Sequence, residues 1–327
     1  MRSLAPLAPL APLALLALTA CSGGVDEATT AASSGTTATG TSGGTGGGAG
    51  TGGGSSTGGG GSAPATEPNA KFLPKPTGTC PEFVTGKTSV SPKGKARNIE
   101  LYVSDAAKTL DGPLVFFWHG AGGSPTEATF ALGKAIEAIK ALGGIVAAPY
   151  HDPAAGQLPW FLDLGGNKDD DLLVADEILA CAIEKVGVDL RRIHSVGFSA
   201  GAMHTEQFAT WRSGYLASIV AYSGARLGQP EDQDPTNKYP AMLFYGGKSD
   251  QVVINFATAT KTYYDNITAE GHFAFTCNHN KGHTVPSDGR NAAWQFLQDH
   301  PFGTSPEPYE KALPGDFPSY CTLGEPQ

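Results

Sequence analysis

Residues 192–201 read RIHSVGFSAG, and this stretch decides how the chain is expected to fold. The apolar run up to Gly197 predicts a strand, and residues 200–212 predict a helix. Between them, Gly197 and Gly201 flank Ser199 in the pattern Gly-x-Ser-x-Gly. The two glycines allow a turn so tight that a Cβ on either side would clash, and such a turn holds Ser199 at the helix N-terminus. The stretch therefore predicts a nucleophilic serine.

The rest of the chain continues this alternation of strands and helices. Further strands are expected at 97–103, 113–118, 144–149, 217–223, 240–245 and 272–276, and further helices at 126–141, 169–186, 255–269 and 288–298. Continuous apolar runs such as PLVFFW (113–118) are typical of strands covered on both faces. The order indicates an α/β domain with a mainly parallel sheet and helices on both faces. In such sheets the chemistry lies at the carboxyl ends of the strands.

A reactive serine needs a base, and the base needs an acid that orients it. We expect the acid downstream of Ser199. Asp250 follows an expected strand and a glycine turn in YGGKSDQVV (245–253). Asp265 falls within an expected helix, and Asp288 stands at the apparent N-cap of the last helix. The pattern therefore favours Asp250.

The base is expected among the histidines that follow the serine. These are His204, His272, His279, His283 and His300. His283 lies in a loop just before the last expected helix, whereas His204 is inside a helix and His272 begins a strand. We therefore favour His283, with His279 as its main rival.

An oxyanion that forms on the substrate requires two backbone N–H donors. Ala200, which follows the serine, is expected to supply one donor. Ala121, in the turn HGAGG (119–123), is expected to supply the other. His119 is expected to brace this turn.

These motifs together resemble the polyhydroxybutyrate depolymerase and feruloyl esterase branch of the α/β-hydrolases. The resemblance rests on WHGAGG (118–123), VDLRRIHSVGFSAGAM (188–203), YGGKSDQVV (245–253), and GHTVP followed by AAWQFL (282–297). It implies an α/β-hydrolase fold without a large lid domain, and hydrolysis of carboxylic esters by a Ser-His-Asp mechanism. It also implies that the enzyme needs neither a metal nor an organic cofactor.

The resemblance leaves the ester unspecified. Members of this branch often have a Cys where this chain has Ala121, and a Trp in the loop that here reads Thr284-Val285. Trp160 and Phe161 are candidate walls of the substrate pocket, with core packing as the alternative. The substrate is expected to be a polyhydroxyalkanoate, a feruloyl ester or a related small ester.

The N-terminal residues have the features of an export signal. Residues 1–20 contain Arg2 and an apolar stretch, and they end in the sequence Leu-Thr-Ala before Cys21. The stretch is too short and too rich in Pro for a spanning helix. Its end resembles the lipobox of bacterial lipoproteins, which implies lipid on Cys21 and a place at a bacterial membrane or cell surface. An ordinary secretion signal with a chance Cys is the alternative.

Residues 21–70 consist almost entirely of Gly, Ser, Thr and Ala. Such a segment buries too little apolar surface to offset the entropy of ordering it, so we expect a flexible tether. Residues 71–327 are rich enough in apolar side chains for one large catalytic domain.

Charge and cysteine content restrict the partners and the compartment. The formal net charge is −9 with no Lys/Arg cluster, which argues against nucleic acid and leaves a covalent lipid as the expected membrane contact. Apart from Cys21, the cysteines are Cys80, Cys181, Cys277 and Cys321. An even number in an exported domain predicts two disulfides, for which three pairings remain open, with buried free thiols as the alternative.

Two other functions fit the same residues. A serine peptidase or amidase would use the same triad, because the triad also cleaves amides. A surface-tethered binding module would carry the triad without using it.

Overall fold

The computed structural model describes residues 70–155, 159–160, 162, 169–228, 230–324 and 326. These residues fall within one compact unit, Ser62–Gln327. The expected signal at 1–20, the lipidation site Cys21, nearly all of the tether and the pocket candidate Phe161 lie outside the described residues. Along the described part of the chain, no helix has both the length and the apolar composition needed to cross a membrane.

One mixed sheet forms the centre of the described domain. Its strands are β1 (Gly86–Val90), β2 (Arg97–Tyr102), β3 (Leu114–Trp118), β4 (Ile145–Pro149), β5 (Ile193–Phe198), β6 (Ser218–Tyr222), β7 (Ala241–Tyr245), β8 (Ala274–Asn278) and β9 (Cys321–Thr322). Their order across the sheet is β1-β2-β4-β3-β5-β6-β7-β8-β9. The pairs from β4 to β8 are parallel, whereas β1, β2 and β9 pair antiparallel at the two sides.

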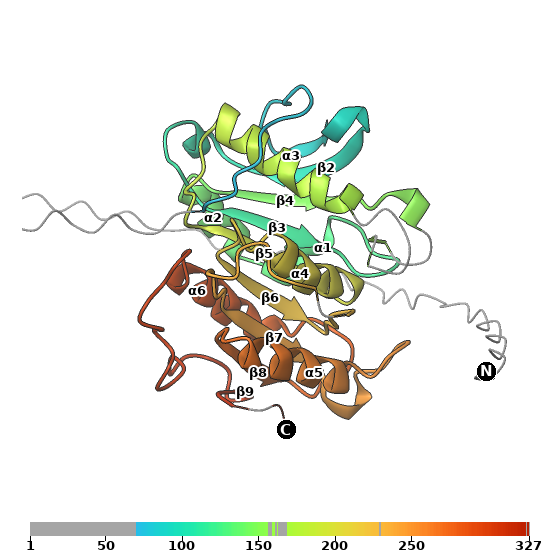
Figure 1. Ribbon diagram of the computed structural model, residues 1–327, viewed down its shortest axis with the longest axis vertical. Coiled ribbons are helices and arrows are strands. Elements are labelled where there is room, and N and C mark those ends of the chain that lie inside the picture. The colour runs from blue at the N-terminus through green and yellow to red at the C-terminus, as the bar shows by residue number, and fades with distance from the viewer. Residues whose placement is uncertain are drawn as a thin grey trace, which may run out of the picture. The chain divides into compact units, whose positions relative to one another are not determined.

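Helices cover both faces of this sheet. They are α1 (Glu127–Leu132), α2 (Ala135–Ala141), α3 (Asp169–Lys185), α4 (Ala200–Trp211), α5 (Phe256–Ala269) and α6 (Arg290–Asp299). Short 3-10 turns lie in the connections at Pro92–Gly94, Asp105–Lys108, Pro153–Ala155, Gly247–Ser249 and Ser287–Gly289. One apolar core contains residues of α3, α4 and α5, and the other contains residues of α1, α2 and α6. Figure 1 shows α3, α4 and α5 on the near face of the sheet.

The central strands alternate between the two cores. In β3, Leu114, Phe116 and Trp118 belong to one core, while Val115 and Phe117 belong to the other. Successive side chains of a strand point to opposite faces, so a strand covered on both sides must be apolar throughout. This confirms the mainly parallel, two-sided α/β architecture expected from the sequence.

Some element boundaries differ from the sequence-based prediction. The helix expected at 126–141 is two helices, because Gly133 has a φ of 54° and interrupts the hydrogen-bonded turns. The last helix begins at Arg290, so the interpretation of Asp288 as its N-cap is wrong. Asp288 instead binds the ammonium of Lys281 at 2.9 Å and accepts a hydrogen bond from the Tyr320 hydroxyl at 3.1 Å.

The four described cysteines form two disulfides, as predicted. Cys80 pairs with Cys181 in α3, and Cys277 in β8 pairs with Cys321 in β9. The second bridge fixes the short edge strand that the sequence pattern did not reveal.

Candidate active site

The turn between β5 and α4 places Ser199 in a strained backbone conformation. Ser199 has φ 55° and ψ −121°, and its N–H donates to the carbonyl of Tyr222 at 2.8 Å. A Cβ at Gly197 would overlap the backbone of Gly201, and a Cβ at Gly201 would overlap the carbonyl of Trp118. Both glycines of the motif are therefore required by close backbone approaches, as the sequence predicted.

The structure brings together the three side chains proposed as the triad. The Ser199 hydroxyl lies 2.9 Å from Nε2 of His283. Nδ1 of the same ring lies 2.7 Å from Oδ1 of Asp250. With the proton on Nδ1, the imidazole donates to the carboxylate and its Nε2 is free to accept the serine proton.

Asp250 is fully buried and accepts hydrogen bonds on both oxygens. Oδ2 accepts from the Ser223 hydroxyl at 2.7 Å and from the N–H of Gly246 at 2.8 Å. Burial raises the pKa of the carboxyl, but the hydrogen bonds from His283, Ser223 and Gly246 outweigh it and lower the pKa below its ordinary value. Asp250 is therefore a stable anion that can orient the imidazole and stabilise its cation.

The loop that carries His283 is fixed by neighbouring backbone and aromatic groups. The N–H of Gly282 donates to the carbonyl of Gly246 at 3.0 Å, which joins this loop to the loop of the acid. The ring of Phe256 stacks on the imidazole with centroids 4.6 Å apart, and Phe198 lies at 4.9 Å. These rings restrict the imidazole to the orientation in which both nitrogens are engaged.

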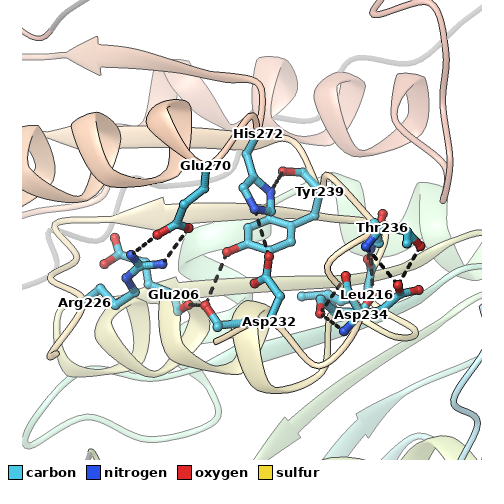
Figure 2. Close-up of polar contacts among 12 residues, drawn as sticks. Glu206, Leu216, Arg226, Asp232, Asp234, Thr236, Tyr239, Glu270 and His272 are labelled. Atoms are coloured by element: carbon cyan, nitrogen blue, oxygen red, sulfur yellow. Dashed lines mark hydrogen bonds and ion pairs between the residues drawn. The ribbon is translucent and has the colours of Figure 1, made fainter. Parts of the chain in front are cut away.

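The competing residues lie elsewhere. His279 is buried, and its Nδ1 accepts from the N–H of Lys281 at 3.2 Å. His272 contacts the carbonyl of Tyr239 and the carboxylate of Asp232, as Figure 2 shows. Asp265 forms an exposed ion pair with a lysine of its own helix. None of these three side chains contacts Ser199, so the geometry favours His283 and Asp250, the residues chosen from the sequence.

The turn at 119–123 lies directly beside Ser199. A Cβ added to Gly120 would lie 3.3 Å from the Cβ of Ser199. Nδ1 of His119 donates to the carbonyl of Gly120 at 2.8 Å, so this ring braces the turn as expected. Burial lowers the pKa of His119 to about 4, which keeps the ring neutral. The donor roles of Ala121 and Ala200 stay predictions.

Trp160 belongs to the core rather than to an open pocket wall. Its side chain is 1% exposed and packs edge-to-face on Trp118 with centroids 5.0 Å apart. Its indole N–H donates to the carbonyl of His119 at 2.9 Å. The core-packing alternative therefore describes Trp160 better, because an indole with almost no exposed surface offers nothing to a substrate.

Sequence reasoning missed Ser223 and Phe256 as parts of this site. The strand was expected to run to Ser223, but it ends at Tyr222, and Ser223 follows at the carboxyl end of the strand. That position was the only signal for it. Among the described residues, no group of three or more His, Cys, Asp or Glu side chains could hold a metal ion.

The comparisons with known proteins agree with this arrangement. Residues 172–301 match the phospholipase/carboxylesterase family of α/β-hydrolases, and this range contains Ser199, Asp250 and His283. Because the match spans less than half of the chain, it supports hydrolysis of ester bonds without defining the whole protein. No curated protein shows significant similarity to the chain.

Solved structures share the fold. The crystal structure of native pOPH has a TM-score of 0.60 and 19% identity, covering 76% of this chain and 98% of its own. Native sOPH has a TM-score of 0.59 and 18% identity, covering 77% and 98%. A thermostable esterase has a TM-score of 0.55 and 18% identity, covering 66% and 62%. Identities this low show the α/β-hydrolase fold alone.

Proposed function

We propose that the protein is a serine esterase that hydrolyses carboxylic esters through Ser199, His283 and Asp250. The observation that carries the proposal is the continuous chain of hydrogen bonds from the Ser199 hydroxyl through both nitrogens of His283 to Asp250. The match of residues 172–301 to the phospholipase/carboxylesterase family supports an ester rather than an amide as the substrate.

The first half-reaction forms an acyl-enzyme. Oγ of Ser199 attacks the ester carbonyl while Nε2 of His283 takes the hydroxyl proton. The tetrahedral oxyanion is held by the N–H groups of Ala200 and Ala121. As the carbonyl re-forms, the bond to the alkoxy oxygen breaks, and His283 returns the proton to that oxygen. The alcohol leaves, and the acyl group remains on Ser199.

The second half-reaction uses water. His283 takes one proton from water as the water oxygen attacks the acyl carbon. When the tetrahedral intermediate collapses, the bond to Oγ breaks and the proton passes from His283 to Ser199. The carboxylic acid is released and the free enzyme is restored, with Asp250 stabilising the imidazolium in both halves.

We propose polyhydroxyalkanoate, feruloyl or related small esters as the substrates. The motifs at 118–123 and 245–253 support this choice through their resemblance to the polyhydroxybutyrate depolymerase and feruloyl esterase branch. Initial rates of the purified domain on short acyl, feruloyl and polyhydroxyalkanoate esters would separate these classes.

Replacement of the nucleophile tests the activity itself. Ser199→Ala should abolish hydrolysis of a short p-nitrophenyl ester and labelling by a fluorophosphonate probe. Ser104→Ala is the control, because this hydroxyl bonds to the carbonyl of Lys140, away from the site. Undiminished hydrolysis by Ser199→Ala would refute the proposal, and absence of labelling in the wild type would favour a binding module.

We propose that the protein is exported and anchored by lipid on Cys21. The apolar segment that ends at Cys21 supports this location. In cells fed radioactive palmitate, the full chain should incorporate label and sediment with membranes, whereas Cys21→Ser should do neither. Label retained by Cys21→Ser would contradict the anchor.

A further inference from the structure

The turn at 119–123 is held by a carboxylate to which the reaction assigns no role. Glu127, the first residue of α1, accepts a hydrogen bond from the N–H of Gly120 on Oε2 at 3.0 Å. The same carboxylate lies against Gly123, and a Cβ at that position would overlap it. The third glycine of HGAGG is thus explained by the space that Glu127 occupies.

Two further side chains fix the same turn. Nδ1 of His119 donates to the carbonyl of Gly120, and the indole of Trp160 donates to the carbonyl of His119. The N–H and the carbonyl of Gly120 and the carbonyl of His119 are therefore each bonded to a side chain. Of these, only Glu127 holds a backbone N–H.

This arrangement determines which N–H groups of the turn remain available. The N–H of Gly120 is bound to Glu127, and the N–H of Gly123 donates to the carbonyl of Gly120 at 3.1 Å. Within the described ranges, no acceptor lies on the N–H of Ala121 or of Gly122. Because Gly120 lies against Ser199, the N–H of Ala121 is the first free donor next to the nucleophile.

We propose that Glu127 is a positioning residue that fixes the turn so that the N–H of Ala121 points at the developing oxyanion. This inference rests on the proposed esterase function. If Glu127 were absent, the N–H of Gly120 would be unsatisfied. Because Ala121 lies between Gly120 and Gly122, the turn could then rotate, and the donor of Ala121 would move away from the oxyanion.

The role belongs to the acceptor oxygen and not to the charge. A negative charge near an oxyanion opposes its formation, whereas a fixed N–H donor stabilises it. Burial raises the pKa of Glu127, with the Gly120 N–H acting in the opposite sense, so the site does not favour the charge. A glutamine has an acceptor oxygen at the same place and should support the turn equally well.

The first test separates binding from the chemical step. Glu127→Ala should lower kcat for a p-nitrophenyl ester about 10- to 100-fold with KM nearly unchanged, since loss of an oxyanion donor costs about 10²–10³ in kcat and a displaced donor costs less. Glu127→Gln should keep kcat within about threefold of the wild type. Thr129→Ala is the matched control, because the hydroxyl of this exposed residue of α1 donates to the carbonyl of Thr126 in its own turn.

A double-mutant cycle tests the contact directly. Gly123 does not have a positive φ, and the three atoms nearest to a Cβ at this position all belong to the Glu127 carboxylate, so this carboxylate is the main source of strain in Gly123→Ala. Gly123→Ala should lower kcat in the wild type and should cost nothing further in the Glu127→Ala background. Thermal melting of each variant shows whether the fold is retained. If Glu127→Ala does not fold, the kcat values of the single variants Gly123→Ala and Glu127→Gln carry the test.

The outcomes separate this inference from the esterase itself. A wild-type protein without hydrolysis that depends on Ser199 would overturn the proposed function. An active wild type whose kcat is unchanged in Glu127→Ala would overturn the positioning role alone. Equal losses in Glu127→Ala and Thr129→Ala, or additive losses for Gly123→Ala and Glu127→Ala, would also overturn it.

Discussion

Removal of the Ser223 hydroxyl should change both the stability of the fold and the pH dependence of hydrolysis. This hydroxyl donates to Oδ2 of Asp250 at 2.7 Å, and the N–H of Gly246 is the other donor to that oxygen. A hydrogen bond to a charged group contributes about 1.5–3 kcal/mol. Ser223→Ala should therefore lower the free energy of unfolding by about that amount at pH 7.

The stability difference should depend on pH with a definite sign. The folded-state pKa of Asp250 is lowered, so its hydrogen bonds stabilise the fold above the unfolded pKa of about 3.9, and this stability is lost as the pH falls through the folded pKa. Ser223→Ala raises the folded pKa of Asp250 towards its ordinary value. The difference in free energy of unfolding between wild type and variant should be largest at pH 7 and should become smaller below about pH 4.

The activity should report the same change. A carboxylate with fewer donors attracts the His283 cation more strongly, so the acid limb of kcat/KM should move to higher pH. Asp250 keeps its other partners, so at the optimal pH the rate should fall by about tenfold or less, or about 1.4 kcal/mol.

Ser223→Gly is the matched control. Ser223 has a φ of 56°, a conformation that costs a non-glycine residue about 1–2 kcal/mol. Glycine relieves this strain but also lacks the hydroxyl, so Ser223→Gly should be more stable than Ser223→Ala and should have the same acid limb. Urea unfolding and pH–rate profiles measure both. A wild-type acid limb in both variants would refute the reasoning.

Three more predictions follow from other buried contacts. Gly201→Ala places a methyl group on the carbonyl of Trp118 and should reduce hydrolysis more than about 100-fold and lower the melting temperature; a variant that hydrolyses like the wild type would contradict the assigned turn geometry. Burial raises the pKa of Glu206 well above its usual value, so stability should fall as the pH rises above the unfolded pKa. Glu206→Gln should remove this slope and stabilise the fold by about 1–3 kcal/mol at pH 8 in urea unfolding, and an unchanged slope would speak against it. Joint replacement of Cys277 and Cys321 by Ala should lower the free energy of unfolding by about 2–4 kcal/mol, and an equal unfolding midpoint would show that the bridge contributes little.

The sequence predicted the features that depend on local pattern. Apolar runs located the central strands, and the Gly-x-Ser-x-Gly pattern located Ser199, because both arise from neighbours in the chain. The order of motifs placed Asp250 and His283 at strand ends, where the parallel sheet brings them together.

Features that arise from contacts between residues far apart in the sequence could not be predicted in this way. The bond of Ser223 to Asp250 joins residues 27 positions apart, and no sequence pattern marks it. Trp160 was a candidate pocket wall because aromatic loop residues often line pockets, yet its indole N–H donates to the carbonyl of His119. Asp288 looked like a helix cap, but the ammonium of Lys281 competes for it.

Ser199 is held by an extension of the sheet beyond its strands. The N–H of Ser199, just past β5, donates to the carbonyl of Tyr222 in β6, and the N–H of Ser223, just past β6, donates to the carbonyl of Phe244 in β7. Both serines have positive φ, at 55° and 56°. The parallel ladder thus continues past the strand ends and turns each serine out of the sheet. Because Ser223 binds Asp250, which follows β7, the same ladder that fixes Ser199 also fixes the distance from β5 to Asp250. The triad geometry is therefore a consequence of sheet register, and a shift between β5, β6 and β7 would disturb all three residues at once.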